Sequence, residues 1–472
     1  MAEEDQKTEH AIFGSAGMAA AGMIRGATGS PRKAGATQVA DESVASDESA
    51  GAEEAALAAA DLADTEAEET ETETESTFIE FATEAIAAAV AALEPPAPPR
   101  SEPVRPKHLR AAAIGHTGSG NFGHGLDLLF QRLDGVRLVA IADADPDGLD
   151  AAQVRTGAEK PYADYREMLE AERLDLVAVG PRETGERHAM VRAALEAGAH
   201  VVCERPIARS LREADELIAL AKEKGLQLAV LHPMRLDPLV RRFHTERAEK
   251  IGDLLEMRVF GMMDHRAGGE DLVVLGTHLF DLVRLFGGEA SFCSATITKE
   301  GEPVIAEDAH FSEKEDLGPV LGDAIHAEFL LESGVRVSYV SDRRLHFLHG
   351  PWGIEFTGTK GKARLFAGQP PTLSLLIDDD PGSPDRSARW MRWPEKDEPY
   401  HESVDGLSGN DAANRLVLRD WLAAIAEDRD PVCSAENAMK CLEMVHGVWQ
   451  AGATKKRAYF PLANRRHPLE EL

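Results

Sequence analysis

The chain is poor in cysteine and in basic residues, and each shortage argues against a class of protein. Only four of its 472 residues are cysteines, they are widely spaced, and none belongs to a CxxC pair. This usage is typical of buried thiols in a reducing compartment rather than of a disulfide framework. Lys and Arg number 51 against 82 Asp and Glu, which gives a net charge of −31. Because nucleic-acid binding needs clustered cations, we expect no nucleic-acid partner.

Long apolar runs are also missing. No stretch reaches the roughly 18 uninterrupted apolar residues of a membrane span. The first ten residues, MAEEDQKTEH, are acidic where a signal peptide is basic and then apolar. We therefore expect a cytoplasmic protein that does not act at a membrane.

Residues 1–106 differ in composition from the rest of the chain. Ala, Gly, Ser, Thr and Glu dominate there, and the segment supplies about half of the net charge. Such a composition cannot bury enough apolar surface to offset chain entropy, which predicts a disordered acidic tail. Within it, FIEFATEAIAAAVAAL at 78–93 predicts an amphipathic helix, either a docking element for a partner or a transient helix. The run EPPAPPRSEPVRP then predicts a stiff linker.

After His108 the sequence alternates between strand and helix patterns. Helical segments separate the predicted strands, including one closed by Gly198 and one at 211–224. The strands are mostly apolar, as a sheet covered on both faces requires. They lie at 110–114, 136–142, 174–179, 200–203 and 226–231. This pattern predicts a doubly wound parallel sheet, an α/β Rossmann domain, at 107–235.

From about Leu254 the rhythm changes to longer, partly alternating strands. The predicted strands lie at 254–261, 326–332, 335–341 and 353–358, with a hairpin turn at 332–334. Two helices, at 411–427 and 434–451, close the chain, and Gly452 is the expected stop of the second. The sequence therefore predicts an α+β domain with a large, mostly antiparallel open sheet at 236–472.

A glycine-rich turn, GHTGSGNFG, follows the first predicted strand. Two registers fit: either Gly118-x-Gly120-x-x-Gly123 matches the dinucleotide fingerprint, three residues further from the strand than usual, or Gly115 makes the turn and Gly118 approaches the phosphates. In both, bare backbone approaches a pyrophosphate, and a helix predicted over 122–129 offers free N–H groups. The predicted cofactor-binding residues of the turn are Gly118, Ser119, Gly120, Asn121, Phe122 and Gly123.

Asp143 ends the second predicted strand, 20 residues after Gly123. A carboxylate at this position accepts hydrogen bonds from the adenosine ribose hydroxyls; the alternative is a solvated carboxylate at a strand end. Residues 144–150, ADPDGLD, contain no Arg or Lys to neutralise a 2′-phosphate. The expected cofactor is therefore NAD rather than NADP.

Several short motifs, taken in order, resemble the Gfo/Idh/MocA oxidoreductase family over about residues 108–465. They are the glycine-rich turn, YADYREML at 162–169, the segment from Val179 to His188, Glu204-Arg205-Pro206, Arg235, GTHLFD at 276–281 and GTKG at 358–361. The resemblance implies a Rossmann domain followed by an open α/β domain, NAD(P) as cofactor, and a homodimer or homotetramer. Sugars, cyclitols and their derivatives are the implied substrates.

The resemblance also implies roles for individual residues. Glu204 is implied to lie at the cofactor, and Pro181 is expected there as well because it follows the strand predicted at 174–179, where open α/β sheets present ligands. Arg205, Arg235 and His278 are implied to bind substrate. Two positions depart from the family pattern, which usually has lysine where this chain has Arg205, and an aspartate four residues before the histidine, where this chain has Val274.

Oxidising a secondary alcohol requires a group that removes the hydroxyl proton as hydride leaves the carbon. Arginine does not deprotonate at ordinary pH, whereas histidine titrates near neutrality. We therefore predict that His278 is the catalytic acid/base and that Arg205 orients substrate and stabilises charge. The alternatives are a structural histidine and a plain salt bridge. Asp264 and His265 are read as loop residues rather than as metal ligands with His278, so no metal is predicted.

These inferences predict an NAD-dependent oxidoreductase that transfers hydride between the nicotinamide and a secondary alcohol of a sugar, cyclitol or related polyol. One alternative is a glycoside hydrolase that uses NAD for transient oxidation and elimination. The other is a non-catalytic NAD-binding protein, suggested by the missing lysine and aspartate. Net NADH formation distinguishes the first function from both alternatives.

Overall fold

The structure is a computed structural model, and it describes residues 108–262, 264–312, 316–348, 352–368, 370–377, 388–394 and 404–470. The predictions made for residues 1–106, namely the disordered tail, the helix at 78–93 and the linker, lie outside the described residues. All four cysteines are described; they are buried and form no disulfide, as predicted.

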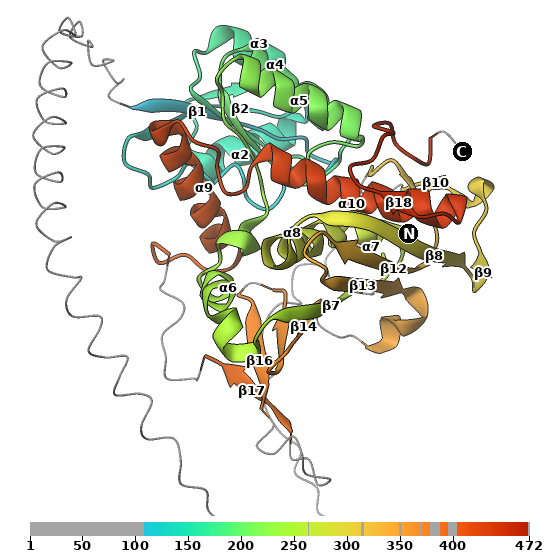
Figure 1. Cartoon of the computed structure of the whole chain (residues 1–472). Coiled ribbons are helices and arrows are strands. Elements are labelled where there is room, and N and C mark those ends of the chain that lie inside the picture. The colour runs from blue at the N-terminus through green and yellow to red at the C-terminus, as the bar shows by residue number, and fades with distance from the viewer. Residues whose placement is uncertain are drawn as a thin grey trace, which may run out of the picture. The chain divides into compact units, whose positions relative to one another are not determined.

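The first sheet has six parallel strands in the order β3-β2-β1-β4-β5-β6, which confirms the predicted Rossmann fold. Figure 1 shows this sheet with helices on both of its faces. Its strand order reverses between β1 and β4, which is the point where such sheets bind their ligands. The strands are β1 Leu109–Ile114, β2 Val136–Ala142, β3 Lys160–Tyr162, β4 Leu176–Val179, β5 His200–Cys203 and β6 Leu228–Val230.

Helices cover both faces of this sheet, which explains its apolar strands. On one face lie α3 (Tyr165–Ala171), α4 (Arg187–Glu196) and α5 (Leu211–Glu223). On the other lie α2 (Pro146–Thr156) and α9 (Gly409–Glu427) from near the chain's end. Helices α2, α3 and α5 begin where the sequence supplies a side-chain cap, and at α5 Ser210 and Glu213 form a capping box.

The helix predicted over 122–129 is not formed, and a series of turns replaces it. Gly123 and Gly125 have φ angles of +60° and +87°, which a right-handed helix cannot accommodate. The bond from the Leu126 N–H to the Phe122 carbonyl is followed by shorter-range bonds within the next turns. The prediction was wrong because the second glycine, two residues after the first, takes the left-handed conformation as well.

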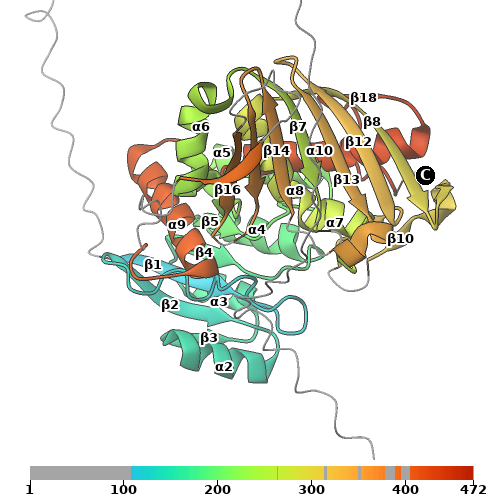
Figure 2. The same cartoon turned by 90° about the horizontal axis from the view of Figure 1, so that it is seen from below.

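The second sheet is mostly antiparallel, as predicted, and its order in the described chain is β17-β16-β15-β14-β7-β13-β12-β8-β18, with β9 beside β8 (Figure 2). Only β7 and β13 run parallel among these pairs. The strands are β7 Leu254–Phe260, β8 Ala290–Lys299, β9 Glu302–Pro303, β12 Ala324–Leu331, β13 Arg336–Asp342, β14 Gly353–Gly358, β15 Lys362–Phe366, β16 Thr372–Ile377, β17 Arg389–Trp393 and β18 Ala458–Tyr459. A separate pair joins β10 (His310–Phe311) to β11 (Pro319–Val320).

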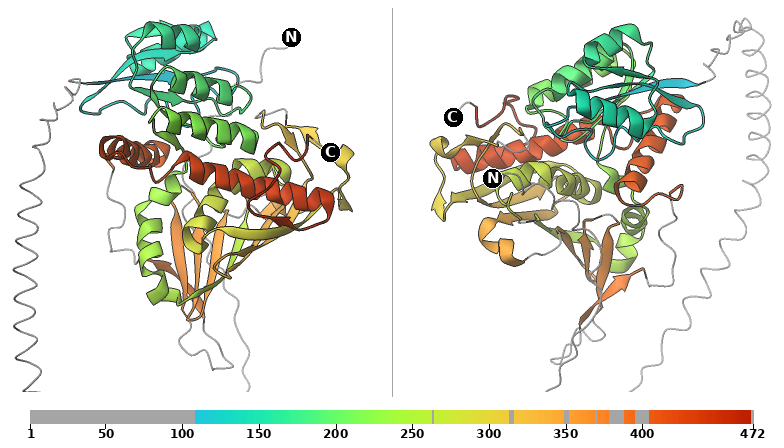
Figure 3. Two further views of the ribbon diagram at one scale, coloured as in Figure 1. Left: turned by 45° about the horizontal axis from the view of Figure 1, so that its top comes forward. Right: turned by 180° about the vertical axis from the view of Figure 1, so that it is seen from behind.

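Three further helices follow the first sheet, after the short 3₁₀ helix η1 (Pro233–Leu236). They are α6 (Pro238–Ile251), α7 (Gly269–Val274) and α8 (Gly276–Gly287). The long helix α10 (Ala435–Thr454) lies between the two sheets, where it contacts α5 and β6 on one side and α8 and β8 on the other (Figure 3). No described helix has both the length and the apolar character needed to cross a bilayer.

Gly452 does not end α10, which was predicted to stop there. The helix continues to Thr454, and Lys455 caps it in the left-handed conformation. A Cβ at Gly452 would lie 2.4 Å from the Ile297 side chain of β8. The glycine therefore permits close packing of the helix on the sheet, and the chain pattern alone does not separate this role from a cap.

Candidate active site

The loops at the carboxyl ends of β1, β4 and β5 carry most of the predicted site residues. The glycine-rich turn follows β1, Pro181 follows β4, and Glu204 and Arg205 follow β5. His278 comes from the first turn of α8 in the second domain. The fold therefore places these residues at the switch point of the first sheet, where open α/β sheets bind ligands.

The glycine-rich turn packs tightly at two glycines and is open at a third. A Cβ at Gly120 would lie 2.5 Å from the Arg182 nitrogen, and one at Gly123 would lie 2.4 Å from the Gly180 carbonyl oxygen. At Gly118, with a φ of +89°, no described atom lies within 4 Å of the Cβ position. A Cβ at Gly115 would lie 2.3 Å from the Phe122 ring, so both registers stay open, and in either the bare backbone at Gly118 is the tip that a pyrophosphate can approach.

Other residues of the turn hold its shape. The His116 and Asn121 backbones form a bridge, and the Asn121 Oδ1 accepts a hydrogen bond of 3.2 Å from the Gly118 N–H. The Ser119 N–H donates to the His116 carbonyl. The buried Phe122 ring occupies the space beside Gly115, so this side chain belongs to the core. Cofactor contacts by Ser119, Asn121 and Phe122 stay predictions.

Asp143 is buried and already engaged by the turn. Both of its oxygens lie 3.0 Å from the Thr117 N–H, and one lies 2.7 Å from the Thr117 Oγ1. The Asp145 N–H donates to it as well. The carboxylate stands where an adenosine ribose is expected, and a ribose would have to share or displace the Thr117 hydroxyl. Sequence reasoning missed Thr117, because a threonine in a turn carries no distinctive signal.

Glu204 is a buried carboxylate held by the residue after the third glycine. Its Oε1 accepts hydrogen bonds from the His124 N–H at 3.0 Å and from the His124 Nδ1 at 2.6 Å. Burial raises the pKa of the Glu204 carboxyl, but the charge and hydrogen bonds of His124, together with Arg205, hold that pKa well below its usual range. Glu204 is therefore ionised. Sequence reasoning missed His124, although its position directly after Gly123 was visible.

Arg205 and His278, which were predicted from separate motifs, lie in contact. The Arg205 Nε donates a hydrogen bond of 3.0 Å to the His278 Nε2. The imidazole proton must then sit on Nδ1, which is buried and has no hydrogen-bond partner among the described residues. Burial and the positive charge of Arg205 place the pKa of His278 well below its ordinary value. His278 is therefore a neutral acceptor in this arrangement.

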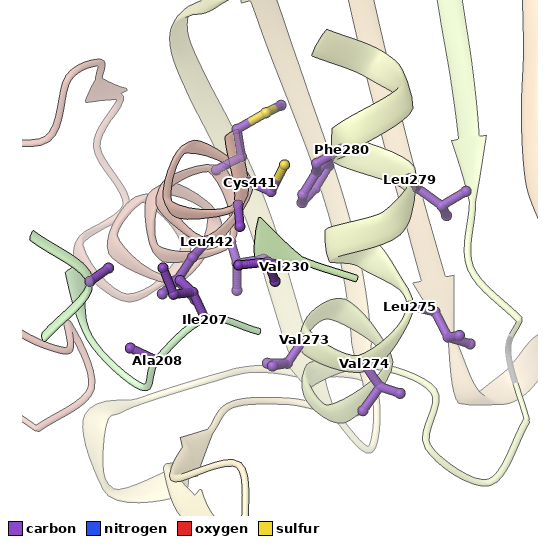
Figure 4. Close-up of a cluster of buried hydrophobic side chains, with 14 of the residues drawn as sticks. Ile207, Ala208, Val230, Val273, Val274, Leu275, Leu279, Phe280, Cys441 and Leu442 are labelled. Atoms are coloured by element: carbon purple, nitrogen blue, oxygen red, sulfur yellow. The ribbon is translucent and has the colours of Figure 1, made fainter. Parts of the chain in front are cut away.

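Two rings and an apolar cluster surround His278. His232 packs edge-on at a centroid distance of 5.4 Å, and Trp352 lies at 6.0 Å. Burial lowers the pKa of His232 to about 4. Val274, at the position of the usual aspartate, is 2% exposed and lies among the apolar side chains of α7 and α8 (Figure 4). A carboxylate there would be buried in the core.

Arg235 forms a buried ion pair. Its Nε lies 2.9 Å and 3.0 Å from the two carboxylate oxygens of Asp281, and its Nη2 donates to the Asp281 carbonyl. Its side chain is 11% exposed. Substrate binding by Arg235 stays a prediction, and Asp281 acts here as the partner of this arginine.

One cluster among the described residues has the spacing of metal ligands. His232, Asp281 and Cys441 offer atoms that lie within 4.8 Å of one another. However, Arg235 already pairs with Asp281, and the Arg284 Nη1 lies 3.9 Å from the Cys441 sulfur. Two guanidinium groups oppose a bound cation, so the cluster does not support a metal site. Asp264, weighed above as a ligand, pairs with Arg266 at 2.7 Å.

Arg187 joins the two loops that carry the site. It is 1% exposed, and its guanidinium donates to the carbonyls of Pro181 and Arg182 after β4 and of Pro206 after β5. Burial lowers the pKa of Arg187 to about 10. Sequence reasoning missed this residue because a single arginine in a helix gives no sign that it is buried.

Comparisons with known proteins agree with this architecture. Residues 112–232 match the GFO_IDH_MocA family, described as an oxidoreductase family with an NAD-binding Rossmann fold, and residues 261–461 match its C-terminal alpha/beta domain. The D-apiose dehydrogenase of Paraburkholderia graminis is 26% identical over 359 residues, 73% of this chain and 87% of the relative. The myo-inositol 2-dehydrogenase of Thermotoga maritima is 28% identical over 290 residues, 59% of this chain and 81% of the relative.

A solved structure supports the fold independently. Levoglucosan dehydrogenase, in complex with NADH and levoglucosan, superposes with a TM-score of 0.60 at 21% identity and covers 75% of this chain and 100% of its own. The two domains and the site thus define an NAD-dependent oxidoreductase. The chain belongs to the Gfo/Idh/MocA oxidoreductase family, and its cofactor is NAD. The open tip at Gly118 and the Asp143 carboxylate fit this cofactor.

Proposed function

We propose that the protein transfers hydride between NAD and a secondary alcohol of a sugar, cyclitol or related polyol. The observation that carries this proposal is the Arg205–His278 pair, which lies at the switch point beside the glycine-rich turn. The names of the relatives, dehydrogenases of D-apiose and myo-inositol, support a substrate rich in hydroxyl groups.

In this proposal Arg205 and His278 orient the reacting alcohol. The guanidinium donates to substrate oxygens and stabilises negative charge as the hydroxyl loses its proton. The His278 imidazole fixes the guanidinium through the bond between Nε and Nε2. Bound NAD supplies the hydride acceptor. Trp352, half-buried beside His278, offers an apolar surface to the carbon face of a sugar ring.

The test is to incubate the purified full chain with NAD and a panel of neutral pentoses, hexoses, anhydrosugars and cyclitols, and to follow NADH by absorbance. We expect NADH to form with at least one member. Cleavage of a glycoside panel without net NADH would instead indicate the oxidation–elimination hydrolase. Tight NAD binding without turnover across both panels would indicate the non-catalytic alternative.

Several further expectations belong to the same proposal. We propose a homodimer or homotetramer in the cytoplasm, with a cofactor domain at 107–235 and a substrate and oligomerisation domain at 236–472. Light scattering of the purified chain measures the oligomeric state. Limited proteolysis near residue 235 tests the boundary, although α9 packs on the first sheet, so both fragments are expected to stay associated.

A further inference from the structure

A second histidine stands at the same edge of the first sheet, and it has the carboxylate partner that His278 lacks. We propose that His124, oriented by Glu204, is the acid/base residue that exchanges a proton with the substrate hydroxyl. This inference rests on the proposed function and reassigns one step within it. His278 then remains a substrate-orienting residue through Arg205.

The geometry of the His124–Glu204 pair fixes which nitrogen can accept a proton. Glu204 is 1% exposed and accepts from both the backbone N–H and the Nδ1 of His124. An ionised carboxylate only accepts hydrogen bonds, so Nδ1 carries a proton, and in the neutral imidazole Nε2 is the nitrogen that keeps a lone pair. The His124 side chain is 35% exposed, so the ring is not enclosed. A carboxylate behind a histidine holds the tautomer and stabilises the imidazolium that forms.

The environment of His278 opposes the same chemistry. Its Nε2 lone pair accepts the Arg205 hydrogen bond, and its Nδ1 is buried. Protonation at Nε2 would break that bond and place an imidazolium beside a guanidinium, and a nearby like charge disfavours the charged form. His124 faces a carboxylate instead. The two histidines therefore differ in the charge of their hydrogen-bond partner, which is negative for His124 and positive for His278.

Two features place His124 beside the loops that carry the site. It follows Gly123, whose Cβ position is only 2.4 Å from the Gly180 carbonyl oxygen after β4. It holds Glu204, whose neighbour in the chain is Arg205.

In the oxidation, the substrate O–H bond breaks and its proton passes to the His124 Nε2. The C–H bond on the same carbon breaks as a hydride that reduces NAD⁺ to NADH, and the remaining electron pair forms the C=O bond. The imidazolium is then paired with the Glu204 carboxylate and releases its proton to water. Reduction of the ketone runs through the same atoms in reverse.

The first experiment measures the tautomer without turnover. The full chain is labelled with ¹⁵N-histidine, and the His124 signals are assigned by their loss in His124→Gln. We expect the neutral imidazole to carry its proton on Nδ1 and not on Nε2, and to lose this preference in Glu204→Gln. A neutral imidazole protonated at Nε2 in the wild-type protein would overturn the inference, whatever the activity.

The second experiment compares His124→Gln with His278→Gln on a substrate from the panel. General acid–base catalysis contributes about 10²–10⁴-fold, so we expect kcat of His124→Gln to fall by about that factor while NAD affinity, followed by cofactor fluorescence, is retained. His278→Gln is expected to raise KM more than it lowers kcat. Loss of turnover in His278→Gln with full kcat in His124→Gln overturns the inference and leaves the proposed function standing.

Discussion

His124 and His278 lie at the same edge of the first sheet, but their partners carry opposite charge. The Nδ1 of His124 faces the buried carboxylate of Glu204, whereas the Nε2 of His278 faces the guanidinium of Arg205. One partner favours an added proton and the other opposes it. Identical side chains are thus prepared for different tasks by one neighbour each. A histidine motif in the sequence does not reveal which task applies, because the neighbour comes from another element.

The largest expected effect on NAD binding comes from Gly123→Ala, which disturbs the pair formed by His124 and the Glu204 carboxylate. The new Cβ would lie 2.4 Å from the Gly180 carbonyl oxygen and 2.6 Å from the Glu204 Oε1. The backbone carbonyl cannot yield easily, so the turn and the His124–Glu204 pair must shift. We expect NAD affinity to fall by about 100-fold, equivalent to about 2.8 kcal/mol.

Calorimetric titration with NAD measures this change, and Gly198→Ala, outside the glycine-rich turn, is the matched control. Gly198 also has a positive φ, of +89°, but no described atom lies within 4 Å of its Cβ position. The control therefore bears backbone strain of about 1 kcal/mol without the collision. Equal losses in both variants would show that strain alone matters and that close packing at Gly123 does not.

The next effect concerns Val274→Asp, which supplies the carboxylate that the family pattern places before the histidine. Val274 is 2% exposed and lies in an apolar cluster, so the new group would be buried there. We expect the free energy of unfolding to fall by about 2–4 kcal/mol, without a gain in kcat. Denaturant unfolding measures the loss, and Val274→Ala provides a comparison that leaves no buried charge. A rise in kcat would show that His278 lacks only a carboxylate to serve as the base.

Arg205→Leu removes the guanidinium that contacts His278. The charge of Arg205 lowers the pKa of His278, so its removal is expected to raise that pKa and let His278 protonate at higher pH. For a base whose pKa is depressed by folding, the unfolded chain binds the proton first, so stability falls as pH drops below about 6.5. In the variant the loss begins at the same pH, which the unfolded chain sets, but it ends at a higher pH and its total is smaller. Histidine NMR titration measures the pKa of His278 directly. An unchanged pKa in the variant would show that Arg205 does not influence the protonation of His278.

The parts of the fold that depend on local pattern were predictable from the sequence. A few neighbouring residues are enough to define an apolar strand, the turn after β1 or Asp143 at the end of β2. The structure contains all three features. The missing helix at 122–129 and the continuation of α10 past Gly452 were not predictable. In both, the meaning of a glycine depends on what packs against it, such as Ile297 from a distant strand.

The site shows the same division. Arg205 and His278 were found because each belongs to a motif, but their contact joins positions 73 residues apart in the chain. His124 and Glu204 are 80 residues apart, and only the fold shows that one holds the other. Arg187 donates to backbone carbonyls, and Thr117 donates to the Asp143 carboxylate. Neither contact can be recognised from composition or spacing.

Thr117→Val has the smallest expected effect and tests the far end of the cofactor site. Valine keeps the shape of threonine and the backbone N–H to Asp143, but it removes the Oγ1 donor at 2.7 Å. If this hydroxyl orients the carboxylate for the ribose, its loss weakens NAD binding by about 1 kcal/mol, or about fivefold in KM, with kcat unchanged. If it competes with the ribose, NAD binding becomes tighter instead. In neither case is proton transfer to His124 expected to change, because the Thr117 contact lies at the end of β2. A fall in kcat would contradict the separation between cofactor binding and proton transfer.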